Sequence, residues 1–327
     1  MRINPEKRNK KVVLASPRGF CAGVVRAIDI VNLALDAWGQ PLYVRREIVH
    51  NKSVVNELRS KGITFVNEVD EVPCGSRVIF SAHGVSPEVT RAAKKRKLKI
   101  IDATCPLVTK VHIEAIRYAR QGYTIILIGH ADHDEVIGTL GEAPDAIRIL
   151  DPTGDVDKLE AVDPEKIACL TQTTLSLNET RSISDNLRRR FPAIRTPTSD
   201  DICYATQRRQ NAVLDLTRQT DLILVVGSAN SSNSRRLVEV AQGVGTAAHL
   251  IDDIEDIQDE WLQDIQSVGL TAGASAPEDL VKKVMRYLNT KGYPSAKSIG
   301  GDVERIEFPL PVELAQIAAD RKNQSNL

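Results

Sequence analysis

The segment KVVLASPRGFC (Lys11–Cys21) runs from a strand-like apolar stretch into a cysteine, and this layout organises the chain because it occurs three times. The later copies are KIIDATC (Lys99–Cys105) and the less apolar SDDIC (Ser199–Cys203). A short polar loop follows each cysteine at a nearly constant distance: Cys21 precedes His50 by 29 residues, Cys105 precedes His133 by 28, and Cys203 precedes Ser231 by 28. This spacing indicates three copies of one unit.

A third feature recurs with the same period. An apolar stretch ends in SAHG (Ser81–Gly84), in TQTT (Thr171–Thr174) and in TAGAS (Thr271–Ser275), between 62 and 72 residues after the cysteine of its copy. Each copy therefore offers one thiol and two polar loops. We expect a pseudo-threefold body whose three thiols meet at the centre. Three thiolates around one point suit an iron–sulfur cluster that keeps one iron open for chemistry.

Within each copy, strand-like and helix-like segments alternate. After Cys21, for example, Val24, Ile28, Val31 and Leu35 keep the spacing of one buried helix face. Continuous apolar strands that alternate with such helices predict an α/β fold of three similar small parallel sheets covered by helices. The polar loops would then lie at the carboxyl ends of the strands, where sheets of this kind bind ligands.

The repeat predicts three domains. The first spans residues 11–101 and is completed by the C-terminal segment 302–316, the second spans residues 102–200, and the third spans residues 201–300. The segment RIEFPLPVEL (Arg305–Leu314) is interpreted as an extra strand, and the polar residues after it as a disordered tail.

Composition narrows the classes of function. The 327 residues carry 43 basic and 43 acidic side chains, so no overall field attracts nucleic acid or a membrane. The basic run RAAKKRKLK (Arg91–Lys99) is interpreted as the solvated face of a helix. Five widely spaced cysteines argue against a secreted disulfide framework, and the N-terminal MRINPEKRNKK lacks the apolar stretch of a signal. We therefore expect a cytoplasmic protein with reduced thiols that binds neither nucleic acid nor a membrane.

The five cysteines fall into two groups. Cys21, Cys105 and Cys203 share one position of the repeat, at a strand-to-helix junction, which favours a common function. Cys74 lies in a turn pattern and Cys169 in a strand pattern, and both are interpreted as structural, the usual role of a lone cysteine. Zinc is an alternative to iron for the first group, although structural zinc sites usually take cysteines in close C-x-x-C pairs, which this sequence lacks.

The polar loops carry the other candidate site residues. They gather hydrogen-bond donors at strand ends and helix starts, an arrangement that holds a phosphate or diphosphate. The donors are His50, His83, His133, Thr173, Ser231, Ser232, Asn233 and Ser275. No GxxxxGK[ST] loop is present and GFCAG lacks the GxGxxG spacing, so nucleotide binding is not supported. Glu135 follows in the loop of His133 and is a candidate proton source.

Eight motifs together resemble the LytB/IspH family: FCAGVVRAI, VHN, SAHGVSP, DATCPLV, TQTTLS, DDICYAT, GSANSSNS and TAGASAP. They stand in the right order, and the resemblance extends from about Lys11 to Leu314. The sequence departs from the family at Asp134, where proline commonly stands between the histidine and the glutamate. Members of this family reduce 4-hydroxy-3-methylbut-2-enyl diphosphate to isopentenyl and dimethylallyl diphosphate, the last step of the methylerythritol phosphate route to isoprenoids.

The resemblance implies a role for each candidate residue. Cys21, Cys105 and Cys203 would bind three irons of one [4Fe-4S] cluster whose fourth iron is not bound by cysteine. The diphosphate would be held by His50, His83, Ser231, Asn233 and Ser275, with Ser232 and His133 alongside. Thr173 would lie close to the substrate hydroxyl and to Glu135, which would deliver a proton to the leaving oxygen. The electrons would come from a ferredoxin or flavodoxin.

Two other classes of function are distinguishable from this one. A zinc-dependent hydrolase would use the histidines of GHADHDE (Gly129–Glu135) as ligands, and a non-enzymatic iron–sulfur carrier would use the cysteines alone. Zinc without iron would favour the hydrolase. A bound cluster without turnover of a hydroxyallyl diphosphate would favour the carrier.

Overall fold

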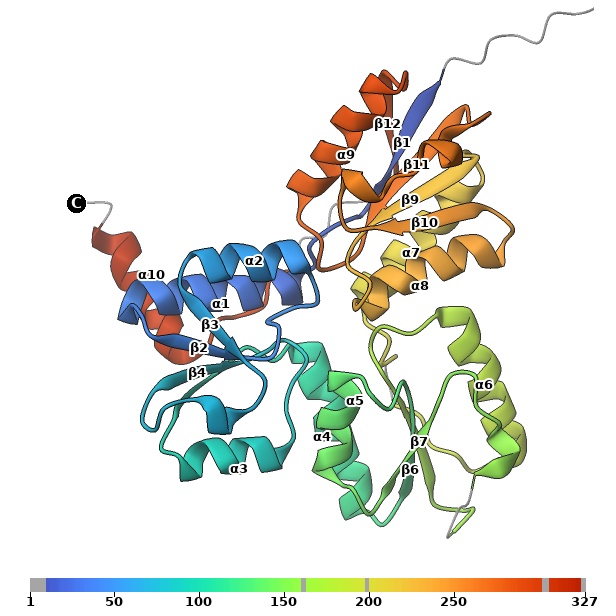
Figure 1. The fold of residues 1–327 in the computed structure, drawn as a ribbon. Helices are drawn as coiled ribbons and strands as arrows, with labels where there is room; N and C mark the ends of the chain where they lie inside the picture. The colour runs from blue at the N-terminus through green and yellow to red at the C-terminus, as the bar shows by residue number, and fades with distance from the viewer. Residues whose placement is uncertain (1–9, 160–162, 198–199, 302–305, 325–327) are drawn as a thin grey trace, which may run out of the picture. The chain divides into compact units, whose positions relative to one another are not determined.

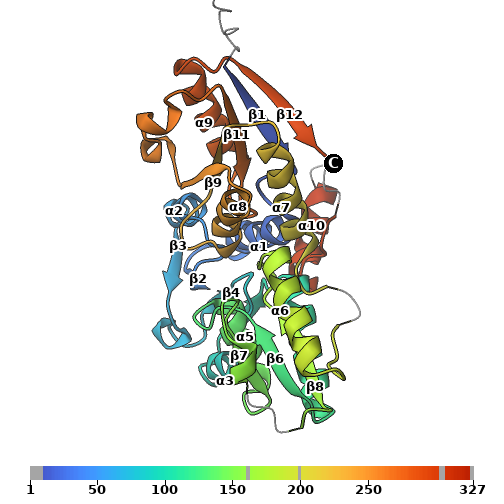
Figure 2. The same cartoon turned by 90° about the vertical axis from the view of Figure 1, so that its right-hand side faces the viewer.

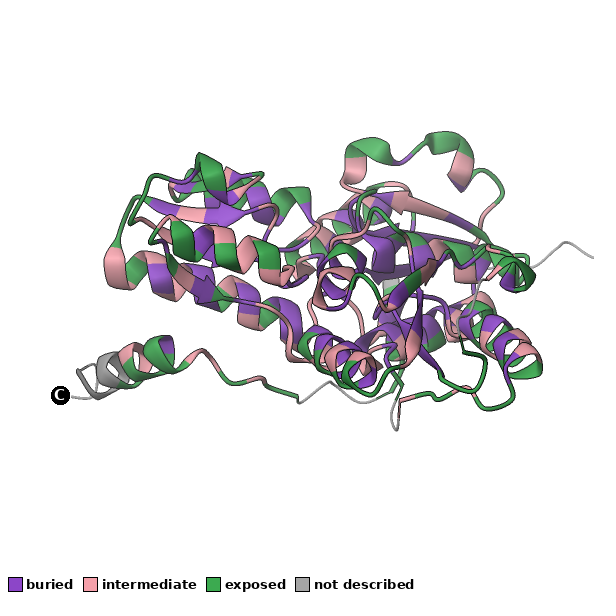
Figure 3. Cartoon of the chain, turned by 90° about the horizontal axis from the view of Figure 1, so that it is seen from below, coloured by how far each residue is buried: buried purple, intermediate pink, exposed green. Residues whose placement is uncertain are grey.

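The computed structural model describes residues 10–159, 163–197, 200–301 and 306–324, and its α/β architecture with several small parallel sheets (Figure 1) confirms the predicted fold class. The arrangement of these sheets around a central cluster stays a prediction. Coloured by burial, the helices have one buried and one exposed face (Figure 3). None of the helices in the described part of the chain combines the length and the apolar character needed to span a bilayer.

The first-repeat sheet has the strand order β3-β2-β4-β5, with every neighbouring pair parallel. Val78 and Phe80 point to one face of it and pack against Ala93 of the helix that follows β4. Its elements are α1 (Ala22–Trp38), β2 (Leu42–Arg45), α2 (Lys52–Ser60), β3 (Ile63–Val66), the 3-10 helix η1 (Val69–Glu71), β4 (Arg77–Phe80), α3 (Pro87–Lys95) and β5 (Lys99–Asp102). The basic run Arg91–Lys99 thus begins on a helix, as predicted.

The second-repeat sheet has the order β7-β6-β8 and buries both of its faces. Along β6, Ile125 packs with the helices α4 and α5, whereas Ile126 packs with α6 on the other side. This explains why the strand is apolar at every position rather than at alternate ones. The elements are α4 (Pro106–Arg120), β6 (Thr124–Ile128), α5 (Asp134–Glu142), β7 (Ile147–Leu150), η2 (Val156–Lys158), β8 (Ile167–Thr171) and α6 (Leu177–Arg190).

The third-repeat sheet has the order β10-β9-β11-β1-β12. Along β9, Leu224 packs with α9, and Val225 packs with α7 and α8 on the opposite face. The elements are β1 (Lys11–Ser16), α7 (Tyr204–Thr217), β9 (Leu222–Val226), α8 (Ser232–Gly243), β10 (Ala247–Ile251), η3 (Ile254–Asp256), η4 (Asp259–Leu262), β11 (Ser267–Ala272), α9 (Glu278–Thr290) and β12 (Ser295–Gly300).

The strand that opens each repeat pairs in the sheet of a different repeat. β1 lies between β11 and β12 (Figure 2), and β5, which leads into Cys105, pairs with β4. Among the described residues before Cys203, Arg195 forms a β-bridge with Ala168 of β8. We expected each opening strand in the sheet of its own repeat. The exchange brings the segment before each cysteine next to the last strand of another repeat, β11, β4 or β8.

Three elements differ from the sequence prediction. The described residues of SDDIC form no strand, because two aspartates interrupt the apolar pattern. The predicted extra strand in RIEFPLPVEL is wrong: Ile306–Pro311 has no regular structure, and the helix α10 (Val312–Gln324) follows and packs against α1. Arg305 and the end of the polar tail lie outside the described residues. The edge strand β12 was not predicted, because its exposed sequence AKSIG has no apolar run.

The chain divides into two compact units. Unit 1 comprises the described residues within Met1–Cys21, His50–Ser53 and Tyr204–Arg305, and unit 2 those within Ala22–Val49, Val54–Cys203 and Ile306–Leu327. Unit 1 contains the third-repeat sheet, and unit 2 contains the other two sheets. The boundaries of the three predicted domains stay a prediction.

Candidate functional site

Each of the three repeat cysteines lies directly before the first residue of a helix. Cys21 precedes α1, Cys105 is the N-cap of α4, and Cys203 precedes α7. None of the three is in a disulfide, and all three residues are half-buried. A helix N-terminus carries unpaired backbone N–H groups and a partial positive charge, which stabilise the thiolate form that binds metals. Three such thiols are a donor set that fits an iron–sulfur cluster.

The backbone holds the three cysteines in the same way. The N–H of Cys105 donates to the carbonyl of Ala82 at 2.9 Å, that of Cys203 to Thr173 at 3.1 Å, and that of Cys21 to Ala274 at 3.1 Å. These acceptors belong to SAHG, TQTT and TAGAS, the loops that close the sheets in which the opening strands pair. The exchange of strands therefore places each thiol beside a polar loop of another repeat.

Cys74 and Cys169 lie in different surroundings. Cys74 is exposed in a turn, and Cys169 is buried within β8, as the sequence indicated. Burial raises the pKa of the Cys169 thiol to about 12, and the nearby Asp201 adds to this effect. A thiol of this kind stays protonated near neutral pH and does not act as a metal ligand.

Glu135 and Thr173 are in direct contact in unit 2. The Thr173 hydroxyl lies 3.0 and 2.9 Å from Oε1 and Oε2 of Glu135, and the Thr173 N–H donates to Oε2 at 3.0 Å. Both side chains are buried. Glu135 is the second residue of α5, whereas the sequence suggested a loop. A buried carboxyl group at hydrogen-bond distance from a hydroxyl can pass a proton to it, so this pair can serve as a proton relay.

His133 fixes the start of the helix that carries Glu135. It is the N-cap of α5, and its Nδ1 accepts the N–H of Glu135 at 3.2 Å. Since Nδ1 is an acceptor, a neutral His133 ring carries its proton on Nε2, where it can be donated to a ligand. His83 lies edge to face with this ring, with the two centroids 6.1 Å apart, and its Nδ1 is 3.3 Å from the Ser81 hydroxyl.

One of the two histidines of GHADHDE is poorly suited to bind zinc. Nδ1 of His133 accepts the N–H of Glu135, so a neutral ring carries its proton on Nε2 and has no nitrogen lone pair left for a metal. Nδ1 of His130 lies 3.2 Å from a carboxylate oxygen of Asp151, a contact that is compatible with metal binding through Nε2.

In unit 1, the polar residues of SANSSNS form the start of α8. Ser231 is the N-cap, and its oxygen accepts the N–H and the hydroxyl of Ser234 at 3.3 and 3.0 Å. Ser232 and Asn233 are the first two residues of the helix, and both are buried. Neither bond of Ser231 uses its own hydroxyl proton, so it can donate to an anion at this helix N-terminus.

Asn233 and Ser275 also have structural contacts within unit 1. Oδ1 of Asn233 accepts the N–H of Ala274 at 2.9 Å, and Ala274 is the residue whose carbonyl holds Cys21. The Ser275 hydroxyl donates to the carbonyl of His50 at 2.8 Å. To bind an anion, Ser275 must exchange this partner. The bond between Asn233 and Ala274, by contrast, connects the start of α8 to the residue that holds Cys21.

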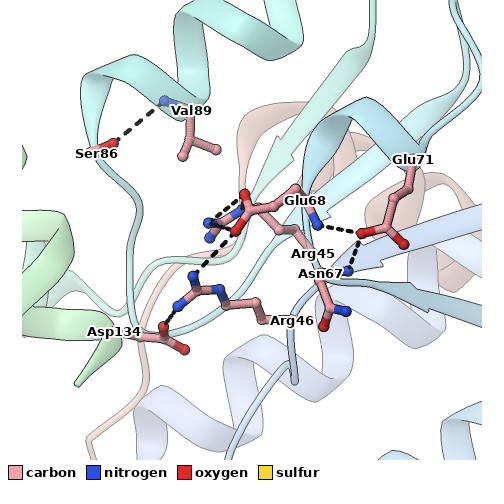
Figure 4. Close-up of polar contacts among 8 residues, drawn as sticks. All are labelled: Arg45, Arg46, Asn67, Glu68, Glu71, Ser86, Val89 and Asp134. Atoms are coloured by element: carbon pink, nitrogen blue, oxygen red, sulfur yellow. Dashed lines mark hydrogen bonds and ion pairs between the residues drawn. The ribbon is translucent and has the colours of Figure 1, made fainter. Parts of the chain in front are cut away.

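Asp134, at the position where the family commonly has proline, is the first residue of α5 and forms an ion pair with Arg46 at the end of β2 (Figure 4). Arg46 also contacts Glu68 at 3.2 Å, and Arg45 contacts the same carboxylate at 2.9 Å. Burial alone would raise the pKa of Glu68, but the hydrogen bonds from Arg45 and Arg46 hold it below its usual value.

This network attaches the start of α5 to the first-repeat sheet. Sequence reasoning identified Asp134 but not its partner Arg46. No pattern in the sequence signals this role of Arg46, because the direction of its side chain depends on a left-handed backbone conformation with φ 55°.

The candidate residues gather in two sets, one in each unit. Unit 2 holds Cys105, Cys203, His83, His133, Glu135 and Thr173, and unit 1 holds Cys21, His50, Ser231, Ser232, Asn233 and Ser275.

The sequence is similar to proteins of one family along nearly its whole length. The profile of the family described as LytB protein matches residues 12–289. The 4-hydroxy-3-methylbut-2-enyl diphosphate reductase of Acidothermus cellulolyticus is 53% identical over 311 residues, which are 95% of this chain and 92% of that protein. The enzyme of the same name from Tolumonas auensis is 54% identical over 307 residues, 93% of this chain and 99% of that protein.

A solved structure gives the same result. The E-1-hydroxy-2-methyl-but-2-enyl-4-diphosphate reductase from Plasmodium falciparum superposes with a TM-score of 0.92 at 39% identity. The superposition covers 96% of this chain and 99% of that one.

Replacing Arg46 by glutamine should loosen the start of α5, because Asp134 loses its charged partner. The pair is partly exposed, so we expect a loss of about 1 kcal/mol, or roughly fivefold faster hydrogen exchange at the amides of Glu135, Val136 and Ile137. Arg59→Gln on the exposed face of α2 is the matched control. Unchanged exchange in Arg46→Gln would show that the ion pair does not hold α5.

Proposed function

This chain belongs to the LytB protein family of 4-hydroxy-3-methylbut-2-enyl diphosphate reductases, and we propose that its three repeat cysteines hold the iron–sulfur cluster that the family implies. The observation that carries the proposal is the shared setting of Cys21, Cys105 and Cys203. Each is a half-buried cysteine outside any disulfide, lies directly before a helix and donates its backbone N–H to a polar loop. Three unrelated structural cysteines would have no reason to share that setting.

The three thiolates would bind three irons of one [4Fe-4S] cluster, and the fourth iron would have no cysteine ligand. When bound, the cluster would pass on two electrons, one at a time, from the donor, and its open iron would be a Lewis acid. The reaction is a reductive dehydroxylation. The allylic C–O bond of the substrate breaks, two electrons and two protons are taken up, and water leaves. The second proton adds at either end of the allylic system, so isopentenyl and dimethylallyl diphosphate both form.

The diphosphate is held by His50, His83, Ser231, Asn233 and Ser275, with Ser232 and His133 alongside. The N-terminus of α8 supports this role, because its backbone N–H groups and buried hydroxyls favour an anion. Histidine ring N–H groups, together with hydroxyl and amide donors, can bind a highly charged group without Lys or Arg. The same side chains keep the substrate in one orientation.

Glu135 delivers the proton that turns the leaving hydroxide into water, and Thr173 relays it. The contact of the Thr173 hydroxyl with both carboxylate oxygens supports this assignment. The N–H of Thr173 keeps the carboxylate in place during the transfer, and burial of both side chains keeps bulk water away. A ferredoxin or flavodoxin delivers the electrons, and the enzyme works in the cytoplasm.

Replacing any one of Cys21, Cys105 and Cys203 with serine should remove most of the bound iron and sulfide from anaerobically purified protein. A hydroxyl is a much poorer ligand for iron than a thiolate. Cys74→Ser and Cys169→Ala are the controls and should keep normal iron content, because Cys74 lies in an exposed turn and Cys169 within β8, away from the repeat position at a helix start. If a control lost as much iron as the repeat variants, the assignment of the three ligands would be wrong.

Glu135→Gln should lower turnover by roughly two to four orders of magnitude, the usual cost of removing a general acid. The amide oxygen can still accept the bonds from Thr173, so iron content and substrate affinity should stay near normal. Asp132→Asn, an exposed change three residues before Glu135, is the control and should leave turnover unchanged. Steady-state kinetics with a reduced dye and isothermal binding measure the two quantities. Near-normal turnover in Glu135→Gln would exclude this residue as the acid.

A further inference from the structure

Each cysteine loop is also held by a basic side chain. Arg26 lies five residues after Cys21, on α1, and its Nη1 donates to the carbonyl of Thr104 at 3.0 Å. Thr104 is the residue immediately before Cys105. The helix that begins after the first repeat cysteine thus holds the loop of the second.

The second cysteine loop and the third are connected in the same way. Lys110 lies five residues after Cys105, on α4, and its Nζ donates to the carbonyl of Asp200 at 3.1 Å and to Oδ1 of Asp201 at 3.2 Å. The Asp201 carboxylate is buried and also accepts the N–H of Thr171 at 3.0 Å. Lys110 therefore fixes the segment that leads into Cys203.

The third contact of this kind is made by Arg209 on α7. Arg209 lies six residues after Cys203, on α7, and is fully buried. Its Nε and Nη2 donate to the carbonyl of Gly19 at 3.1 and 2.7 Å, and Nη2 is 3.3 Å from the carbonyl of Phe20. Gly19 and Phe20 are the two residues before Cys21. A cation from one repeat thus holds the cysteine loop of the next, in all three repeats.

The three cations all reach the cysteine loops through backbone carbonyl oxygens, those of Thr104, Asp200 and Gly19. A hydrogen bond to a carbonyl holds the loop while the side chain keeps its positive charge. Burial lowers the pKa of Arg26, whereas the negative charges of Asp102 and of the Cys105 thiolate raise it, so Arg26 interacts electrostatically with a repeat cysteine.

We propose that Arg26, Lys110 and Arg209 are positioning residues that hold the cysteine loops and that their positive charge raises the reduction potential of the cluster. This inference rests on the proposed function. An electron added to a thiolate-bound cluster increases its negative charge, and a nearby cation stabilises that reduced state. Arg209 should contribute most, because it is fully buried and solvent screens its charge least.

The test is a redox titration of the anaerobically purified holoenzyme, followed by electron paramagnetic resonance. Arg209→Gln should shift the one-electron reduction equilibrium by about tenfold toward the oxidised cluster, which corresponds to about 59 mV. Arg209→Lys keeps the positive charge, so its reduction potential should lie close to that of the wild-type protein. Arg208→Gln is the matched control: it makes the same charge change at the neighbouring, exposed position and should leave the potential unchanged.

Two further variants decide the question if Arg209→Gln does not fold. Lys110→Gln and Arg26→Gln should give smaller shifts in the same direction, with the exposed Arg120→Gln on α4 as their control. Cluster-loaded neutral variants with the wild-type potential would overturn the proposal, as would an equal shift in Arg208→Gln. Failure of the proposed function would differ, because the wild-type protein itself would then contain no iron and sulfide.

Discussion

The backbone hydrogen bond from each repeat cysteine to a loop of another repeat is the constraint on which the rest of the structure depends. It requires the strand before the cysteine to pair outside its own repeat, as β1 and β5 do. It also places each cysteine directly before the first residue of a helix and beside a polar loop of another repeat. The positions of the polar loops follow, because the acceptors Ala82, Thr173 and Ala274 belong to them.

The polar side chains of the candidate site have a structural contact in addition to the proposed ligand contact. His133 caps α5 with one ring nitrogen, and Asn233 holds the N–H of Ala274. Because these side chains are fixed before a ligand arrives, little conformational entropy is lost on binding. Substitution at such a position is therefore expected to affect both the local structure and the affinity for the diphosphate.

The sequence predicted the elements that depend on local patterns. The apolar runs of β6 and β9, the helix after Cys21 and the equivalence of the three cysteines all follow from periodicity and spacing. The partner of an exchanged strand could not be predicted, because an apolar run such as Lys11–Ser16 fits any buried sheet position. β12 has no apolar run. Arg46 and Arg209 were missed because their roles arise from contacts between segments far apart in the chain.

The central claim is that three equivalent cysteines hold one cluster and leave one iron without a cysteine ligand. Mössbauer spectroscopy of iron-57-labelled protein, with and without the diphosphate substrate, tests this claim most directly. The account predicts iron sites in a ratio of three to one, with only the minor site changing when substrate is added. Four iron sites that respond alike, or a protein that binds zinc in place of iron and sulfide, would contradict it.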